Sequence, residues 1–277
     1  MTLGVAIVGV NLVLAVVGPT IAPYDPEVTG VGPSLEPPSA RHPFGTDQLG
    51  MDIFSRVISA PRTDMTIAVC AVAISLIVGV MLGLLAATAR RWIASSILRL
   101  ADIAQSLPVF ITAMALVAFS GQNVRNVTVA LGFVLAPQFL RLTRNQALLV
   151  KSQPYVEAAT VAGLPRRLIL LRHILPNSLG PTLVHASVLV GFSILLTAGL
   201  SFIGAGVRAP TPEWGSMIAV AAPNFITGSW WPSVFPGLAL AVTVMGWALL
   251  GEQLGRAVGA EGAEVELEEQ ASLREPI

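Results

Sequence analysis

SQPYVEAATVAGLPRRLILLRHILP, residues 152–176, is the longest polar interruption in the second half of a very apolar chain. Its pattern predicts two short helices with a break between them. Ser152 can cap the first helix, and Pro154 is tolerated in its first turn because the N–H groups there have no helical partner. Gly163 is predicted to stop this helix as its C′ residue, and Pro165 is placed to open the second helix. We expect Pro176 to end the second helix.

The side chains of this stretch divide into an apolar stripe and charged positions beside it. Glu157 lies near the N-terminal end of the first helix, where a carboxylate is favoured. In the second helix three leucines recur at helical spacing, and three arginines lie off that stripe. An ordinary amphipathic loop of a membrane protein shows the same features. The leucines and arginines are Leu168, Leu171, Leu175, Arg166, Arg167 and Arg172.

Composition places the chain in a membrane. Of its 277 residues 54% are hydrophobic and 12% are charged, and the mean hydropathy is +0.74. Soluble domains carry about 25% charged residues. The formal net charge of zero argues against nucleic acid as a partner. Cys70 is the single cysteine, so a disulfide framework within one chain is excluded.

Six apolar segments predict an all-α membrane protein with six transmembrane helices. The first segment, within residues 1–18, lacks the basic lead of a signal peptide and is interpreted as a helix that stays in the membrane. Small residues give the second segment a close-packing face at Gly79 and Gly83. Pro108 is expected to kink the third segment. Arg141 and Arg144 can snorkel, so the fourth segment can extend to residue 150. The predicted spans are residues 3–18, 66–89, 93–119, 127–140, 179–203 and 233–250.

The remaining segments complete the expected organisation. Residues 19–64 form a proline-rich segment, residues 65–251 a five-helix core that contains the 152–176 loop, and residues 252–277 an acidic, solvated and partly disordered tail. Basic residues gather on one side of the spans, whereas the short segment 121–126 carries only Arg125. The positive-inside rule then places the 152–176 loop, the tail and both termini in the cytoplasm, and the proline-rich segment outside.

Charged residues near the spans allow two kinds of interpretation. Arg99 and Asp102 are three residues apart and can pair within the membrane as a functional site. We favour instead an ion pair at the cytoplasmic end that locks the helix to a neighbour. His42, Asp47 and Asp52 suggest a metal site, but their spacing is not a tight ligand pattern, and turn-forming surface residues are the favoured interpretation.

Three motifs carry a resemblance to bacterial ABC-importer permeases. Glu157-Ala158-Ala159, then Gly163 and Leu175-Pro176, resemble the EAA loop of that family. HPFGTDQLGMDIFSR at 42–56, and LSFIGAG followed by PTPEWG between 200 and 215, resemble the C-type subunit of dipeptide and oligopeptide permeases. The chain departs from the pattern at Met51, where the family usually has arginine, and at His173, where it has isoleucine.

The resemblance implies the fold and the working complex. It implies the type I importer fold, with the proline-rich segment as an extracytoplasmic addition after the first helix. It further implies a second homologous permease subunit, two ATPase domains that bind ATP and Mg, and an extracytoplasmic binding protein, in the bacterial inner membrane. This chain would then be a non-catalytic subunit without a cofactor or metal, which forms half of the translocation path. The loop would couple it to the ATPase through Glu157, Ala158, Ala159, Gly163, Arg166, Arg167, Arg172, Leu175 and Pro176.

Other functions stay open at this point. Nickel or another small solute is an alternative substrate within the same branch. A secondary transporter would show internal repeats and intramembrane charges in corresponding halves, and we find neither. A membrane enzyme would need a nucleophile and base or a ligand set. The sequence has no GxxxxGK[ST], HExxH or GxSxG motif, and His185 is the one histidine within a predicted span, interpreted as a packing or pore residue.

Overall fold

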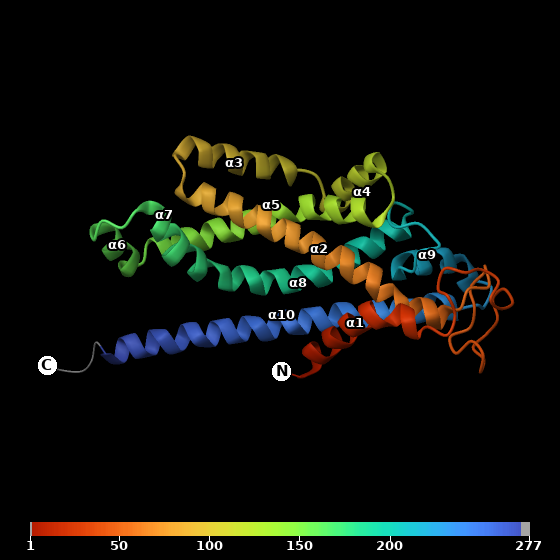
Figure 1. The fold of residues 1–277 in the computed structure, drawn as a ribbon. Coiled ribbons are helices and arrows are strands. Elements are labelled where there is room, and N and C mark those ends of the chain that lie inside the picture. The colour runs from red at the N-terminus through yellow and green to blue at the C-terminus, as the bar shows by residue number, and fades with distance from the viewer. Residues whose placement is uncertain (1, 273–277) are drawn as a thin grey trace.

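Long helices lying side by side make up most of the chain (Figure 1). The computed structural model describes residues 2–272, and the β-type pairing within that range is an isolated bridge between Thr46 and Asp52. The all-α prediction is confirmed. The helices are α1 Thr2–Ile21, α2 Ile53–Thr88, α3 Arg91–Ala104, α4 Val109–Ser120, α5 Val124–Lys151, α6 Pro154–Val161, α7 Arg166–Ile169, the π-helical turn η1 Leu170–Ile174, α8 Leu175–Phe202, α9 Trp214–Phe225 and α10 Trp231–Ser272.

Small residues bring α2 and α5 into close contact, as the sequence predicted. A Cβ atom added at Gly79 would collide with Phe139, and one at Gly83 would lie 2.7 Å from the carbonyl oxygen of Leu140. The Ser75 hydroxyl also donates to the Gly132 carbonyl of α5 at 3.0 Å. Because lipid offers no hydrophobic force between helices, such backbone approach and hydrogen bonding hold the pair together.

The first helix packs into the bundle through small and polar residues. Thr243 of α10 donates to the Asn11 side chain of α1 at 2.9 Å, and Gly246 leaves room for Ile7. Gly18 lies against the α2 backbone at Ile58. α1 is therefore held between α2 and α10.

The count of membrane spans agrees with the prediction, with one change of shape. Within residues 2–272, five helices are long and apolar enough to cross a membrane, and there are six if α3 and α4, which meet at 83°, are counted as one span. The predicted third span, 93–119, is therefore broken rather than kinked. Pro108 caps α4, and a proline both lacks an N–H group and disfavours helix at the residue before it.

Several boundaries differ from the sequence prediction. α2 begins at Ile53, where Asp52 accepts from the Ser55 N–H, so the proline-rich segment covers residues 22–52 instead of 19–64. α1 continues through Pro19, and α5 extends to Lys151. α10 continues to residue 272, so this part of the expected disordered tail is helical, consistent with its many Ala, Glu and Leu residues. Residues 273–277 of that tail lie outside the described residues.

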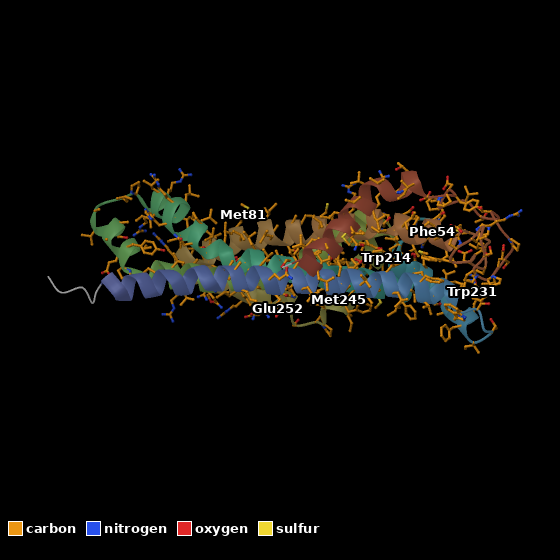
Figure 2. All side chains as sticks on the ribbon, turned by 90° about the horizontal axis from the view of Figure 1, so that it is seen from below. Phe54, Met81, Trp214, Trp231, Met245 and Glu252 are labelled. Carbon is orange, nitrogen blue, oxygen red and sulfur yellow. The ribbon has the colours of Figure 1, made fainter. Side chains whose placement is uncertain are left out.

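The two ends of the bundle carry different structures. α6 and α7 cap one end, and the proline-rich segment and α9 lie at the other (Figure 1). Figure 2 shows Phe54, Trp214 and Trp231 together at the second end. There the Trp231 indole donates to the Thr46 carbonyl at 3.2 Å, and the Trp214 indole donates to the Val57 carbonyl at 3.2 Å. The aromatic rings thus fasten the proline-rich segment and α9 to α2 and α10.

Candidate functional site

The 152–176 loop folds as a compact turn around Gly163. Gly163 has φ +79°, in the left-handed region that favours glycine. Its N–H donates to the Thr160 carbonyl at 3.1 Å, and the Leu164 N–H donates to the Ala159 carbonyl at 3.2 Å. This is the Schellman arrangement that satisfies the last carbonyls of a helix. The predicted stop of α6 at Gly163 is confirmed.

Two other predictions about the loop backbone are wrong. Ser152 does not cap α6, because its hydroxyl donates backwards to the Leu149 carbonyl at 2.8 Å and closes α5. Gln153 occupies the cap position of α6 instead. Pro165 opens α7 as its N-cap, as expected. Pro176 does not end a helix either, since the chain is helical from Arg166 to Phe202.

The π-helical turn η1 explains how Pro176 fits inside this helix. The Leu175 N–H donates to the Leu170 carbonyl, five residues back. This wider turn interrupts the regular i→i−4 hydrogen bonds of the helix just before Pro176, which has no N–H to donate. The second short helix of the loop is therefore the beginning of α8.

The buried face of the loop is not the predicted stripe of leucines. Val156, Ile169 and Ile174 pack against Ala147 and other small residues of α2 and α5. Two of the three leucines of the predicted stripe face outward: Leu168 is 39% exposed and Leu171 61% exposed, whereas Leu175 is half-buried. Ile169 and Ile174 are the side chains of this segment that face the bundle.

The exposed face of the loop combines apolar and charged side chains. Val161 at the end of α6 is 83% exposed. Arg166, Arg167 and Arg172 are exposed, as is Glu157 in the first turn of α6. Among the side chains that the structure describes, none forms an ion pair with these four residues. The loop thus presents free charges and apolar groups on a backbone anchored by its own small core.

The predicted pair of Arg99 with Asp102 is corrected by the structure. Asp102 of α3 accepts from the Arg141 guanidinium of α5 at 2.5 Å, and both side chains are about half exposed. α3 packs beside α5, so the carboxylate finds a partner across the helices instead of within its own turn. The expected lock to a neighbouring helix is present, with Arg141 in place of Arg99.

His42, Asp47 and Asp52 do not assemble as a metal site. Among the described residues no group of three metal-binding side chains comes together. Asp47 forms a turn, as expected, by accepting from the Leu49 N–H at 2.8 Å. His42 and Asp52 are buried, not at the surface, and their side chains pair at 2.8 Å.

Buried charges at the same end were missed by the sequence reasoning. Arg56 is 4% exposed and donates to the Pro26 carbonyl at 2.6 Å and to the Pro210 carbonyl at 3.0 Å. Glu213 is fully buried and caps α9 by accepting from the Gly215 and Ser216 N–H groups at 2.8 and 2.7 Å. Both residues lie within the quoted motifs, which is the one signal that could have pointed to them.

Glu213 also contacts another acid. The Asp64 carboxylate of α2 accepts from the Trp214 N–H at 3.3 Å and lies against the Glu213 carboxyl group. Burial raises the pKa of Glu213, partly offset by hydrogen bonds from Ser201 and from the N-terminus of α9. The acids therefore tie α9 to both α2 and α8.

The histidine in the fifth span, His185, packs on an aromatic neighbour. Its ring meets the Phe139 ring edge-on, with 5.6 Å between the centroids. This contact accords with the interpretation of His185 as a packing residue.

Comparisons with known proteins agree with the motifs. The family model described as "Binding-protein-dependent transport system inner membrane component" matches residues 79–259. The chain is 38% identical over 246 residues to the probable D,D-dipeptide transport system permease protein DdpC of Escherichia coli K12, which covers 89% of this chain and 82% of that protein. It is 36% identical over 251 residues to the dipeptide transport system permease protein DppC of Alkalihalophilus pseudofirmus, covering 91% and 82%.

A solved structure shares the fold. A chain of the MetNI methionine ABC transporter, in an inward-facing conformation, superposes with a TM-score of 0.61 at 18% identity. The match covers 73% of this chain and 96% of that one.

Proposed function

The chain belongs to the family of binding-protein-dependent transport system inner membrane components, and we propose that it is the permease subunit of an ATP-driven importer of dipeptides or oligopeptides. The substrate class is supported by relatives named as peptide permeases that match about nine-tenths of the chain. The quoted motifs at 42–56 and 200–215 support the same branch.

The observation that carries the coupling role is the exposed face of the 152–176 loop. Free basic side chains and exposed apolar groups such as Val161 and Leu171 stand on a turn that is fixed by Gly163 and by buried Ile169. Such a rigid, mixed surface suits a cleft on a separate ATPase subunit, whose movement would tilt α8 and switch the open side. In this role Gly163 shapes the turn, and the arginines meet acidic groups of the ATPase. The coupling residues that we propose are Glu157, Ala158, Ala159, Gly163, Arg166, Arg167, Arg172, Leu175 and Pro176.

The proposed complex has further members. A second, homologous permease subunit would complete the translocation path, two ATPase domains would bind ATP and Mg, and an extracytoplasmic protein would deliver the peptide. This chain would then be a non-catalytic subunit that holds no cofactor of its own. Its place would be the bacterial inner membrane, with the loop and both termini in the cytoplasm and the proline-rich segment outside, as the distribution of Arg and Lys favours.

Reconstitution of the whole complex tests the proposed function. ATP hydrolysis and uptake are measured in proteoliposomes against dipeptides, longer peptides and Ni²⁺, with the binding protein present. We expect peptides to stimulate both activities. Stimulation by Ni²⁺ alone would show that the substrate is the metal ion and not a peptide. Uptake that does not require ATP would indicate a secondary transporter.

A pair of surface variants tests the docking face itself. Val161→Ser removes an exposed apolar group from the loop, and Ile226→Ser removes an equally exposed one, 92% accessible, from the opposite end. If Val161 is buried by the ATPase, the loop variant should weaken binding of the ATPase by roughly tenfold. Equal ATPase affinity in the two variants would exclude Val161 from the docking face.

A further inference from the structure

A cavity of about 650 Å³ lies beside the proline-rich segment, at the end of the bundle opposite the 152–176 loop. Its lining comes from residues 19–27, from α2 between Ser59 and Thr66, from Val124 at the start of α5, and from residues 211–212 before α9. Small-molecule sites in proteins typically enclose ~300–1,000 Å³. Four separate parts of the chain thus meet around a space large enough for a small ligand.

Opposite charges line this cavity without touching one another. Arg62 projects from α2, and Asp25 and Glu27 belong to the proline-rich segment. All three are exposed, and none forms an ion pair with a side chain that the structure describes. One oxygen of Asp25 accepts from the Glu27 N–H at 2.9 Å, which leaves the other oxygen free. A positive and a negative group therefore remain available to one ligand.

A buried hydroxyl in the lining also lacks a partner. Ser59 is 2% exposed, and its Oγ atom has no hydrogen bond to any group that the structure describes. A buried polar group without a partner loses its hydration and gains nothing in return, so native proteins seldom leave one unused. Ser59, Arg62 and Thr66 recur at helical spacing along one face of α2. Ser59 and Arg62 therefore lie on the same face of α2.

We propose that this cavity binds a small zwitterion, with the anionic end of the ligand on Arg62 and the Ser59 hydroxyl and its ammonium end on Asp25 or Glu27. Two sources offer this chemistry. A free short peptide carries a carboxylate and an ammonium group, and this source rests on the proposed function. A phosphoethanolamine lipid headgroup carries a phosphate and an ammonium group, and this source does not.

Binding to the purified complex of the full chain with its partner subunits, without binding protein or nucleotide, tests the proposal. The probes are dialanine, dialanine amide, N-acetyl-dialanine, dihexanoyl phosphatidylethanolamine and dihexanoyl phosphatidylglycerol, measured by titration calorimetry. The variants are Arg62→Gln, Arg62→Lys and Arg41→Gln. Arg41 is the matched control, because it is an exposed arginine of the proline-rich segment that does not line the cavity.

We expect at least one zwitterionic probe to bind, and its blocked or anionic analogue to bind about tenfold more weakly or worse. Arg62→Gln should weaken binding of the zwitterion to a similar extent. Arg62→Lys should keep most of the affinity, and Arg41→Gln should keep all of it. Binding of dialanine identifies a peptide as the source, and binding of the ethanolamine lipid identifies the headgroup. If Arg62→Gln does not assemble, the double variant Asp25→Asn with Glu27→Gln should lose the preference for dialanine over N-acetyl-dialanine.

Three results would overturn the proposal: no probe binds, the blocked probes bind as tightly as the zwitterion, or Arg41→Gln weakens binding as much as Arg62→Gln. The transport assay is separate from this one. Peptide uptake by a complex that binds no zwitterion would contradict the proposed cavity site and leave the importer function intact. Zwitterion binding without ATP-driven uptake would contradict the importer function and leave the cavity site intact.

Discussion

Replacing Gly163 by valine is expected to separate ATP hydrolysis from transport. An added Cβ atom at Gly163 meets nothing within 4 Å, so the valine introduces backbone strain without a clash. A left-handed conformation costs a residue with a Cβ atom roughly 1–2 kcal/mol. That penalty lowers the population of the docking-competent turn, relative to relaxed loop conformations, by a factor of about 5–30. If the turn couples the ATPase to α8, uptake per ATP hydrolysed should fall by a comparable factor.

The assay compares peptide uptake and ATP hydrolysis in proteoliposomes that contain the complete complex. Gly30→Val is the matched control, because Gly30 has φ +71° and an added Cβ atom there also meets nothing, but it lies in the proline-rich segment. Gly163→Asn should fall between wild type and valine, since asparagine tolerates the left-handed region better. Membrane insertion should be unchanged in all variants.

A wild-type ratio of uptake to hydrolysis in Gly163→Val would refute the coupling role of the turn. An equal loss in Gly30→Val would show that the strain acts through general stability, and would refute the reasoning in the same way.

Three further predictions concern packing and charge. Gly79→Ala should destabilise the purified protein by about 1–3 kcal/mol, because its Cβ atom has no room against α5; a thermal-unfolding measurement checks this. A double-mutant cycle of Asp102→Ala and Arg141→Ala should give a coupling energy of about 0.2–1 kcal/mol, as for other exposed pairs, and zero coupling would contradict the ion pair. Burial raises the pKa of Glu213, which lies against Asp64, above its ordinary value of 4.5. The folded state therefore favours the protonated carboxyl group. This contribution to stability is complete below pH 4.5 and is lost as the pH rises through the raised pKa. The unfolding temperature should therefore decline with increasing pH above 4.5, and Glu213→Gln should flatten that decline.

Local chemistry allowed much of the fold to be predicted. The length of the apolar runs is set by the thickness of the bilayer, so the number of spans followed from the sequence. Gly163 was predicted as a helix stop because a glycine suits the left-handed C′ position. The small residues Gly79 and Gly83 likewise predicted where two helices approach closely.

Features that depend on several helices at once were beyond prediction. Whether Asp102 pairs with Arg99 or Arg141 depends on how α3 lies against α5, and spacing within one helix carries no information on that. Whether Leu171 or Ile174 faces the bundle depends on how the loop lies against α2 and α5. The PTPEWG motif marks Glu213, but its burial depends on how α9 lies against α2.

The unbroken helix from Arg166 to Phe202 makes the loop and the fifth span one mechanical part. Its 37 residues measure about 55 Å at 1.5 Å per residue. One helix therefore connects the loop to the opposite end of the bundle. Near its far end Ala198 lies directly against Gly215 in the first turn of α9. If the ATPase docks at the arginines, as we propose, a displacement of the loop would move both ends of this helix together.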